Sequence, residues 1–132
     1  MREIKFRGKS FKTGKMVYGF LIIEESTKCF IHWTENDEMK AENVIPETVG
    51  QYTGLPDKNG KDIYEGDIVD GGKGEIFYCD KSAMFKVRWH DKIYKNVRCC
   101  NPSYNNGEKL FMNAAIAWEV IGNIYENPEL LK

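Results

Sequence analysis

Basic and apolar side chains alternate over residues 85–90 of the chain. Successive side chains of an extended strand point to opposite faces, so we expect Phe85, Val87 and Trp89 to pack inward. The basic residues between them would form an outward row with a spacing of about 7 Å. Small β-barrels bind single-stranded nucleic acid with a basic groove and exposed aromatic rings, so this row is a candidate nucleic-acid surface. The row consists of Lys86, Arg88 and His90.

More basic and aromatic residues follow this row in the sequence. Tyr94 could stack on a base, and Lys95 and Arg98 add positive charge. The candidate set for binding a partner or nucleic acid is Lys86, Arg88, His90, Tyr94, Lys95 and Arg98. The alternative is a solvated strand face, whose charges keep an antiparallel strand from pairing with other chains. The sequence leaves both interpretations open.

Charge is unevenly distributed along the chain, although the formal net charge is only −1. Residues 1–15 carry six basic side chains and one acidic side chain, and residues 73–98 carry seven basic and three acidic ones. Residues 24–47, in contrast, carry two basic and seven acidic side chains. A basic strand against an acidic loop suits self-association, and the basic segments suit an acidic partner equally well.

The sequence offers little for catalysis, which needs a positioned base, a nucleophile or a metal. The two histidines, His32 and His90, lie in separate predicted strands, and Asp91 would point away from His90 because neighbours on a strand face opposite sides. We therefore predict that the chain is not an enzyme. The alternative, an enzyme of unrecognised type, requires a pocket that places a histidine beside a carboxylate.

The four cysteines do not form a metal-binding pattern. No Cys-x-x-Cys pair is present, and the adjacent Cys99 and Cys100 would point to opposite faces of a strand. We expect reduced thiols, no metal and no cofactor. The glycine-rich segment 71–74 also lacks the Lys-Ser/Thr and helix that a phosphate-binding loop requires, so we interpret it as a loop between strands.

The elements that must position these residues are mostly strands. Residues 16–33 predict a hairpin, and residues 84–89 predict a strand with two distinct faces. The polar stretch 34–42 predicts a loop or one short helical turn, whereas residues 108–117 favour a short helix. Residues 118–125 predict a last strand. Short strands with glycine-rich turns indicate a mainly β fold with minor α content, in the form of a small barrel or sandwich.

Three segments carry a resemblance to a known family. Met1–Arg7, Gln51–Val69 and Glu119–Leu131 are similar to the opening, central and closing segments of the YopX-like proteins of phages and prophages. The resemblance implies an SH3-type β-barrel in the larger C-terminal part. It implies no activity and no site residues, because none is assigned for the family.

Together, these observations predict a small N-terminal β unit over residues 1–50 and an SH3-type barrel over residues 51–132. We expect a non-catalytic module that binds a phage or host macromolecule, self-associates, or does both; the alternative is a nucleic-acid-binding barrel that uses its basic strand face. The longest apolar run, residues 17–23, is too short for a membrane span, which needs about 20 residues. We therefore expect no membrane partner and a cytoplasmic location in a bacterial host cell.

Overall fold

The computed structural model describes residues 2–89 and 118–131, the side chain of Trp89 excepted. The chain divides into two compact units, residues 1–54 and residues 55–132. The boundary after residue 54 lies inside a strand, and it is four residues beyond the boundary after residue 50 that the sequence predicted. The predicted helix over 108–117, and all site residues from His90 to Arg98, lie outside the described residues.

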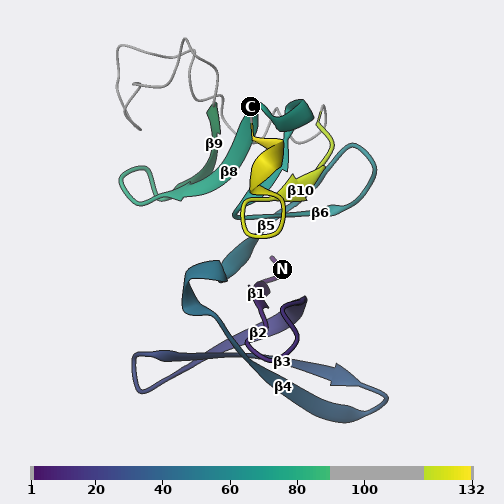
Figure 1. Cartoon of the computed structure of the whole chain (residues 1–132), viewed down its shortest axis with the longest axis vertical. Helices are drawn as coiled ribbons and strands as arrows, with labels where there is room; N and C mark the ends of the chain where they lie inside the picture. Colours follow the sequence, from purple (N-terminus) through teal and green to yellow (C-terminus); the bar gives the residue numbers. More distant parts are fainter. Residues whose placement is uncertain (1, 90–117, 132) are drawn as a thin grey trace. The chain divides into compact units, whose positions relative to one another are not determined.

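The first unit is built from antiparallel strands (Figure 1). Four of them are β1 (Phe6–Lys9), β2 (Met16–Glu24), β3 (Lys28–Glu35) and β4 (Glu38–Val44). The 3-10 helix η1 (Pro46–Thr48) then leads into β5 (Gly50–Pro56), which pairs with β1 and runs into the second unit. The predicted hairpin over 16–33 is confirmed by the pairing of β2 with β3.

A sharp change of partner occurs at Gly19 in β2. The first part of β2 pairs with β1, from Met16 to Gly19, and the second part pairs with β3, from Phe20 onward. A Cβ atom at Gly19 would collide with the backbone carbonyl oxygen of His32, so only glycine allows the two strands to approach here. The strand can therefore serve two partners without a break in the chain.

The acidic segment after β3 is a strand, and the prediction of a loop or helical turn over 34–42 is wrong. β4 pairs with β3 along its whole length, from Glu38 opposite Glu35 to Val44 opposite Cys29. The reversal between them is a two-residue turn at Asn36 and Asp37, both of which have positive φ. Asn and Asp tolerate this conformation, which is the one that tight hairpins require.

The second unit contains shorter strands around a separate core. Its elements are β6 (Asp62–Tyr64), β7 (Asp67–Val69), the 3-10 helix η2 (Asp70–Gly72), β8 (Gly74–Cys79), β9 (Met84–Trp89), β10 (Gly122–Asn123) and the 3-10 helix η3 (Pro128–Leu130). The core residues are Ile63, Val69, Ile76, Val87 and Val120. In the first unit the corresponding cluster is Cys29, Ile31 and Val44.

The fold is mainly β, as predicted, with two antiparallel sheets and no α-helix among the described residues. The sheets have the strand orders β4-β3-β2-β1-β5-β6 and β10-β7-β8-β9. No closed barrel is found in the described part of the chain, because β9 and β10 are the two ends of the second sheet. The predicted last strand over 118–125 is reduced to Gly122–Asn123, since the polar residues after it form a turn.

Residues 2–89 and 118–131 contain no helix with the length and hydropathy of a membrane span.

Candidate functional site

The predicted basic row begins on β9, which pairs with β8. Val87 is fully buried in the core, and Phe85 packs beside it, as the alternation predicted. On the opposite face, however, Lys86 is only 9% exposed. The expectation that Lys86 lies in an open, solvated row is therefore wrong.

Arg88 is the exposed member of the row, and its guanidinium group contacts the neighbouring strand. The guanidinium carbon lies 4.3 Å from the ring centroid of Phe77, and Nη1 lies 4.0 Å from Oε2 of Glu75. These contacts follow from the register, which places Glu75 directly opposite Arg88. Part of the positive charge is thus balanced within the hairpin. The remaining predicted members, His90, Tyr94, Lys95 and Arg98, lie outside the described residues.

The loop between β5 and β6 is organised by one buried carboxylate, that of Asp57. Its Oδ1 accepts hydrogen bonds from the backbone N–H groups of Asn59 (2.8 Å) and Lys61 (2.9 Å). Its Oδ2 accepts one from the N–H of Val120 at 3.0 Å, which lies 63 residues further along the chain. Asp57 therefore connects the central segment that carries the family resemblance to the closing one.

The pKa of Asp57 lies below its ordinary value. Burial is the largest single influence and raises the pKa, because it removes water from the carboxylate. The hydrogen bonds from Val120, Lys61 and Asn59, together with the charge of Lys61, lower the pKa and outweigh burial. Backbone N–H donors thus keep the carboxylate ionised. Through these bonds the carboxylate stabilises the loop between β5 and β6.

A second buried acid, Asp67, is the first residue of β7 and directly follows a turn. Its Oδ2 accepts a hydrogen bond from the backbone N–H of Tyr64 at 2.8 Å, in agreement with the general behaviour of Asp in turns. Gly66 beside it has φ of +92°, and a Cβ there would lie 2.9 Å from the ring of Tyr125. Backbone hydrogen bonds from Ile121 to Ile68 and from Ile124 to Gly66 hold the closing segment against this turn. The polar residues of the central and closing segments therefore serve the fold.

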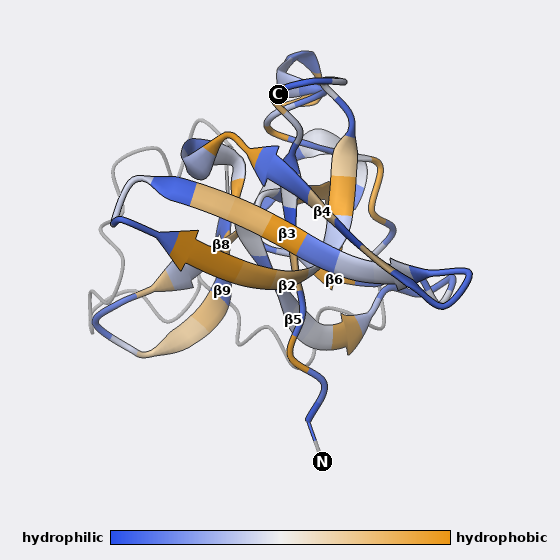
Figure 2. Ribbon diagram, turned by 90° about the horizontal axis from the view of Figure 1, so that it is seen from below, coloured by the Kyte–Doolittle hydropathy of each residue, from blue (hydrophilic) through white to orange (hydrophobic). Residues whose placement is uncertain are grey.

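A different surface, in the first unit, exposes large hydrophobic side chains to solvent. We call it the outer face: the alternate residues of β2, β3 and β4 that point away from the core of the first unit. The outer face comprises Met16, Tyr18, Phe20, Ile22 and Glu24 of β2, Lys28, Phe30, His32 and Thr34 of β3, and Met39, Ala41 and Asn43 of β4. Hydrophobic residues run along β2 and along β3 beside it, as Figure 2 shows.

The outer face is rich in large apolar side chains, and several of them are exposed. Phe20 is 67% exposed and Met39 is 70% exposed, and Tyr18 and Ile22 are also exposed. The charged residues of the outer face, Glu24 and Lys28, lie opposite each other at one end of β2 and β3. The acidic residues of β4 alternate onto the other side of the sheet. Sequence analysis missed this surface, although the alternation of large apolar residues with core residues in β2 was a usable signal.

His32 lies on the outer face, between Phe20 of β2 and Ala41 of β4. Its cross-strand neighbours are therefore apolar, and no carboxylate lies opposite it. This position differs from the pairing of a histidine with a carboxylate that the enzyme alternative requires. Within the described ranges, no group of three His, Cys, Asp or Glu side chains is arranged to hold a metal ion.

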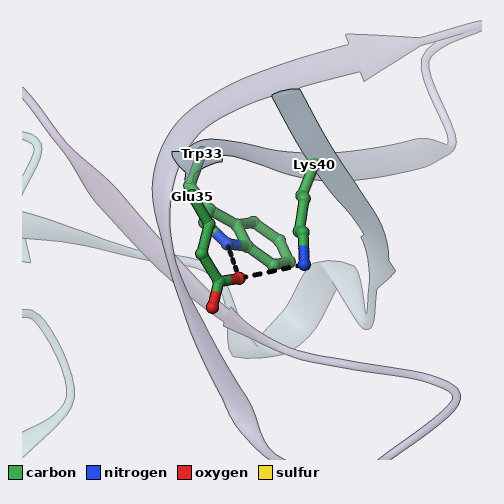
Figure 3. A network of polar contacts seen from close by, with 3 residues as sticks. All are labelled: Trp33, Glu35 and Lys40. Atoms are coloured by element: carbon green, nitrogen blue, oxygen red, sulfur yellow. Dashed lines mark hydrogen bonds and ion pairs between the residues drawn. The ribbon is translucent and has the colours of Figure 1, made fainter. Parts of the chain in front are cut away.

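The opposite side of the β3–β4 hairpin carries a polar network, drawn in Figure 3. Oε2 of Glu35 lies 3.2 Å from Nζ of Lys40 and accepts a hydrogen bond from Nε1 of Trp33 at 3.5 Å. The hydrogen bond from Lys40 is the main cause that lowers the pKa of Glu35, followed by the bond from Trp33 and the charge of Lys40. All three residues of the network belong to the β3–β4 hairpin, and they lie on the side of the sheet opposite to the outer face.

Comparison with known proteins places the chain in a family. The family described as YopX protein matches residues 5–132. The chain belongs to the YopX family. The crystal structure of protein EF1440 from Enterococcus faecalis is similar, with 25% sequence identity, a TM-score of 0.53 and 100% coverage of both chains. No curated protein matches the chain.

The YopX match confirms the family resemblance that the three sequence segments indicated, and it extends over both units. Neither the name YopX nor the name EF1440 specifies an activity, a ligand or a partner. The function of this YopX protein must therefore be argued from its own surfaces.

Proposed function

We propose that this YopX protein is a non-catalytic module that binds a protein of a phage or its bacterial host in the cytoplasm. The outer face is its binding surface. The observation that carries the proposal is the exposure of large apolar side chains on one face, above all Phe20 at 67%, with the charged pair Glu24 and Lys28 at its end. Soluble proteins rarely leave such side chains clustered in water unless a partner covers them.

The energetics favour a protein partner. Complete burial of a side chain such as Phe20 or Ile22 contributes about 1.5–3 kcal/mol relative to leaving it exposed. Aromatic anchors at the centre of an interface commonly dominate its binding energy. Phe20 lies on β2, with Tyr18 and Ile22 along the same strand and His32 opposite it on the central strand β3.

The nucleic-acid alternative has weaker support. Nucleic-acid affinity depends on cationic side chains that neutralise phosphates, and the outer face has one, Lys28, which lies opposite Glu24. On β9, Lys86 is buried and Arg88 contacts Glu75 and Phe77. The SH3-type barrel over residues 51–132 remains part of the proposal, supported by the antiparallel order of β7, β8 and β9 around one apolar core.

The experiment places a photo-crosslinking amino acid at Phe20 and, in a matched control, at Phe11. Phe11 is 61% exposed, so it has nearly the same accessibility, but it lies in the turn between β1 and β2, outside the outer face. The two tagged variants are irradiated in phage-infected bacteria, with and without nuclease treatment of the lysate.

We expect a discrete protein adduct from position 20 and none from position 11. The substitution Phe20→Glu should abolish recovery of the same protein, whereas Phe11→Glu should leave it unchanged. Equal adducts from both positions, or none from position 20, would contradict the proposal. Recovery that depends on nuclease-sensitive material would favour the nucleic-acid alternative. Circular dichroism of the two glutamate variants verifies that both remain folded.

A further inference from the structure

β4 is an edge strand, and no described residue pairs with most of its outer edge. It is the first strand in the order β4-β3-β2-β1-β5-β6, so β3 is its one strand partner in the described sheet. Only its last residues are paired on the other side, where Val44 forms a bridge with Ser10. The open part of the edge therefore runs from Glu38 to Glu42.

The hydrogen bonds at the end of β4 show which backbone groups face this edge. The carbonyl of Asn43 accepts a hydrogen bond from the N–H of Phe11 at 3.1 Å, and the N–H of Ile45 donates to Lys9 at 2.9 Å. Backbone groups of alternate residues point to the same side of a strand. The N–H and C=O groups of Met39 and Ala41 therefore point away from β3, toward the open edge.

Near this edge, an exposed apolar side chain lies between two side chains of opposite charge. Met39 is 70% exposed, on the outer face. Glu38 and Lys40 flank it on the opposite face and carry opposite charges. Glu38 lies across the hairpin from Glu35, and it has no cationic partner in the described chain. An antiparallel partner with Lys beside Glu in the same order would supply that charge.

We propose that two copies of this chain pair through their β4 edges, antiparallel and about a two-fold axis at Met39. In this register, the two Met39 residues exchange both backbone hydrogen bonds, and each Glu38 lies opposite Lys40 of the other copy. The exposed Met39 side chains meet on the outer face. A second copy is the fitting occupant because a two-fold axis makes the Glu-Met-Lys sequence complementary to itself.

Neighbouring registers are less favourable. A two-fold axis at Lys40 places the two Lys40 ammonium groups opposite each other, which is repulsive. An axis at Ala41 also pairs Lys40 with an acid, Glu42, but it requires the carbonyl of Asn43, which already accepts a bond from Phe11. The register at Met39 is the one that combines open backbone groups with opposite charges.

The test is a charge exchange within β4, measured by sedimentation equilibrium of the full chain over a wide concentration range at low salt. We expect the native protein to dimerise reversibly. Lys40→Glu should weaken the dimer by roughly tenfold or more, because two attractive pairs become repulsive. The double substitution Glu38→Lys with Lys40→Glu should restore most of the affinity, since the pairs are then re-formed with exchanged charges.

The second exchange, Glu42→Lys with Lys40→Glu, distinguishes the registers and should not restore the dimer. Restoration by Glu42→Lys instead of Glu38→Lys would overturn the register at Met39, and a native chain that stays monomeric at every concentration would overturn the pairing itself.

The Phe20→Glu variant should dimerise like the native chain, because Phe20 lies on β2, away from this edge. Loss of the dimer in that variant would place the contact on the outer face and contradict edge pairing. Far-ultraviolet circular dichroism verifies the fold of the Lys40 variants, since Lys40 also pairs with Glu35.

Discussion

Single side chains in this protein hold segments that are distant in sequence. Asp57 is the main case, because three backbone N–H groups donate to one carboxylate that is only 5% exposed. A sequence pattern could predict the turn at residues 56–60 from its Pro, Asp, Asn and Gly residues. It could not predict the bond to Val120, because a contact across 63 residues depends on how the whole unit folds.

We predict that Asp57→Asn lowers the free energy of unfolding of the second unit by about 1–3 kcal/mol at neutral pH. The Asn side chain has one oxygen, so at least one of the three N–H groups would lose its acceptor. Chemical denaturation followed by tryptophan fluorescence measures this change. An unchanged free energy of unfolding would show that water replaces the carboxylate at no cost.

The same carboxylate predicts a pH dependence. The pKa of Asp57 is lowered in the folded protein, so its stabilising effect is fully present above the unfolded pKa of about 3.9 and is lost as the pH falls through the folded value. The difference in stability between the native protein and the Asp57→Asn variant should therefore be constant near neutral pH and should shrink below about pH 4. Denaturation series at several pH values test this, and a difference that grows on acidification would contradict it.

At the scale of elements, alternation predicted the strands better than their surroundings. The pattern over 84–89 correctly placed Val87 in the core, and the hairpin over 16–33 is present. Alternation cannot tell, however, whether the second face of a strand is covered. It therefore predicted neither the burial of Lys86 nor the exposure of Phe20. β4 was not predicted because an edge strand needs few apolar residues. The sequence feature that indicates it is the Asn36–Asp37 pair, which favours a tight hairpin turn.

The two faces of β9 should respond differently to truncation. We predict that Val87→Ala destabilises the protein by about 1–3 kcal/mol, because it removes two methyl groups from a fully buried position and leaves a cavity. Arg88→Ala should cost less than about 1 kcal/mol, since the Arg88 side chain is 54% exposed and its ion pair with Glu75 is long, at 4.0 Å. Thermal unfolding of both variants measures the difference, and an equal loss in the two would show that Arg88 is part of the core.

At the scale of the whole molecule, the sequence predicted the fold class and the family but did not fix how the sheets end. The short apolar runs and glycine turns indicated antiparallel strands, because period-two alternation reflects strand geometry directly. Closure into a barrel depends on pairing between first and last strands, which no local pattern encodes. The outer face was missed for a similar reason: whether a large side chain is covered depends on elements remote from it in sequence.

The two apolar clusters share no residue, and this predicts separable stability. One contains Ile31, the other contains Ile76, and both side chains are fully buried. Ile→Ala at either position should cost about 2–5 kcal/mol within its own unit, through lost burial and a residual cavity. Because sites without shared partners contribute independently, we expect Ile31→Ala to speed amide hydrogen exchange in β2 and β3 and to leave β7 and β8 unchanged. Ile76→Ala should do the reverse. Faster exchange throughout the chain after either substitution would mean that the units unfold together, and the two clusters would then have to be treated as one cooperative core.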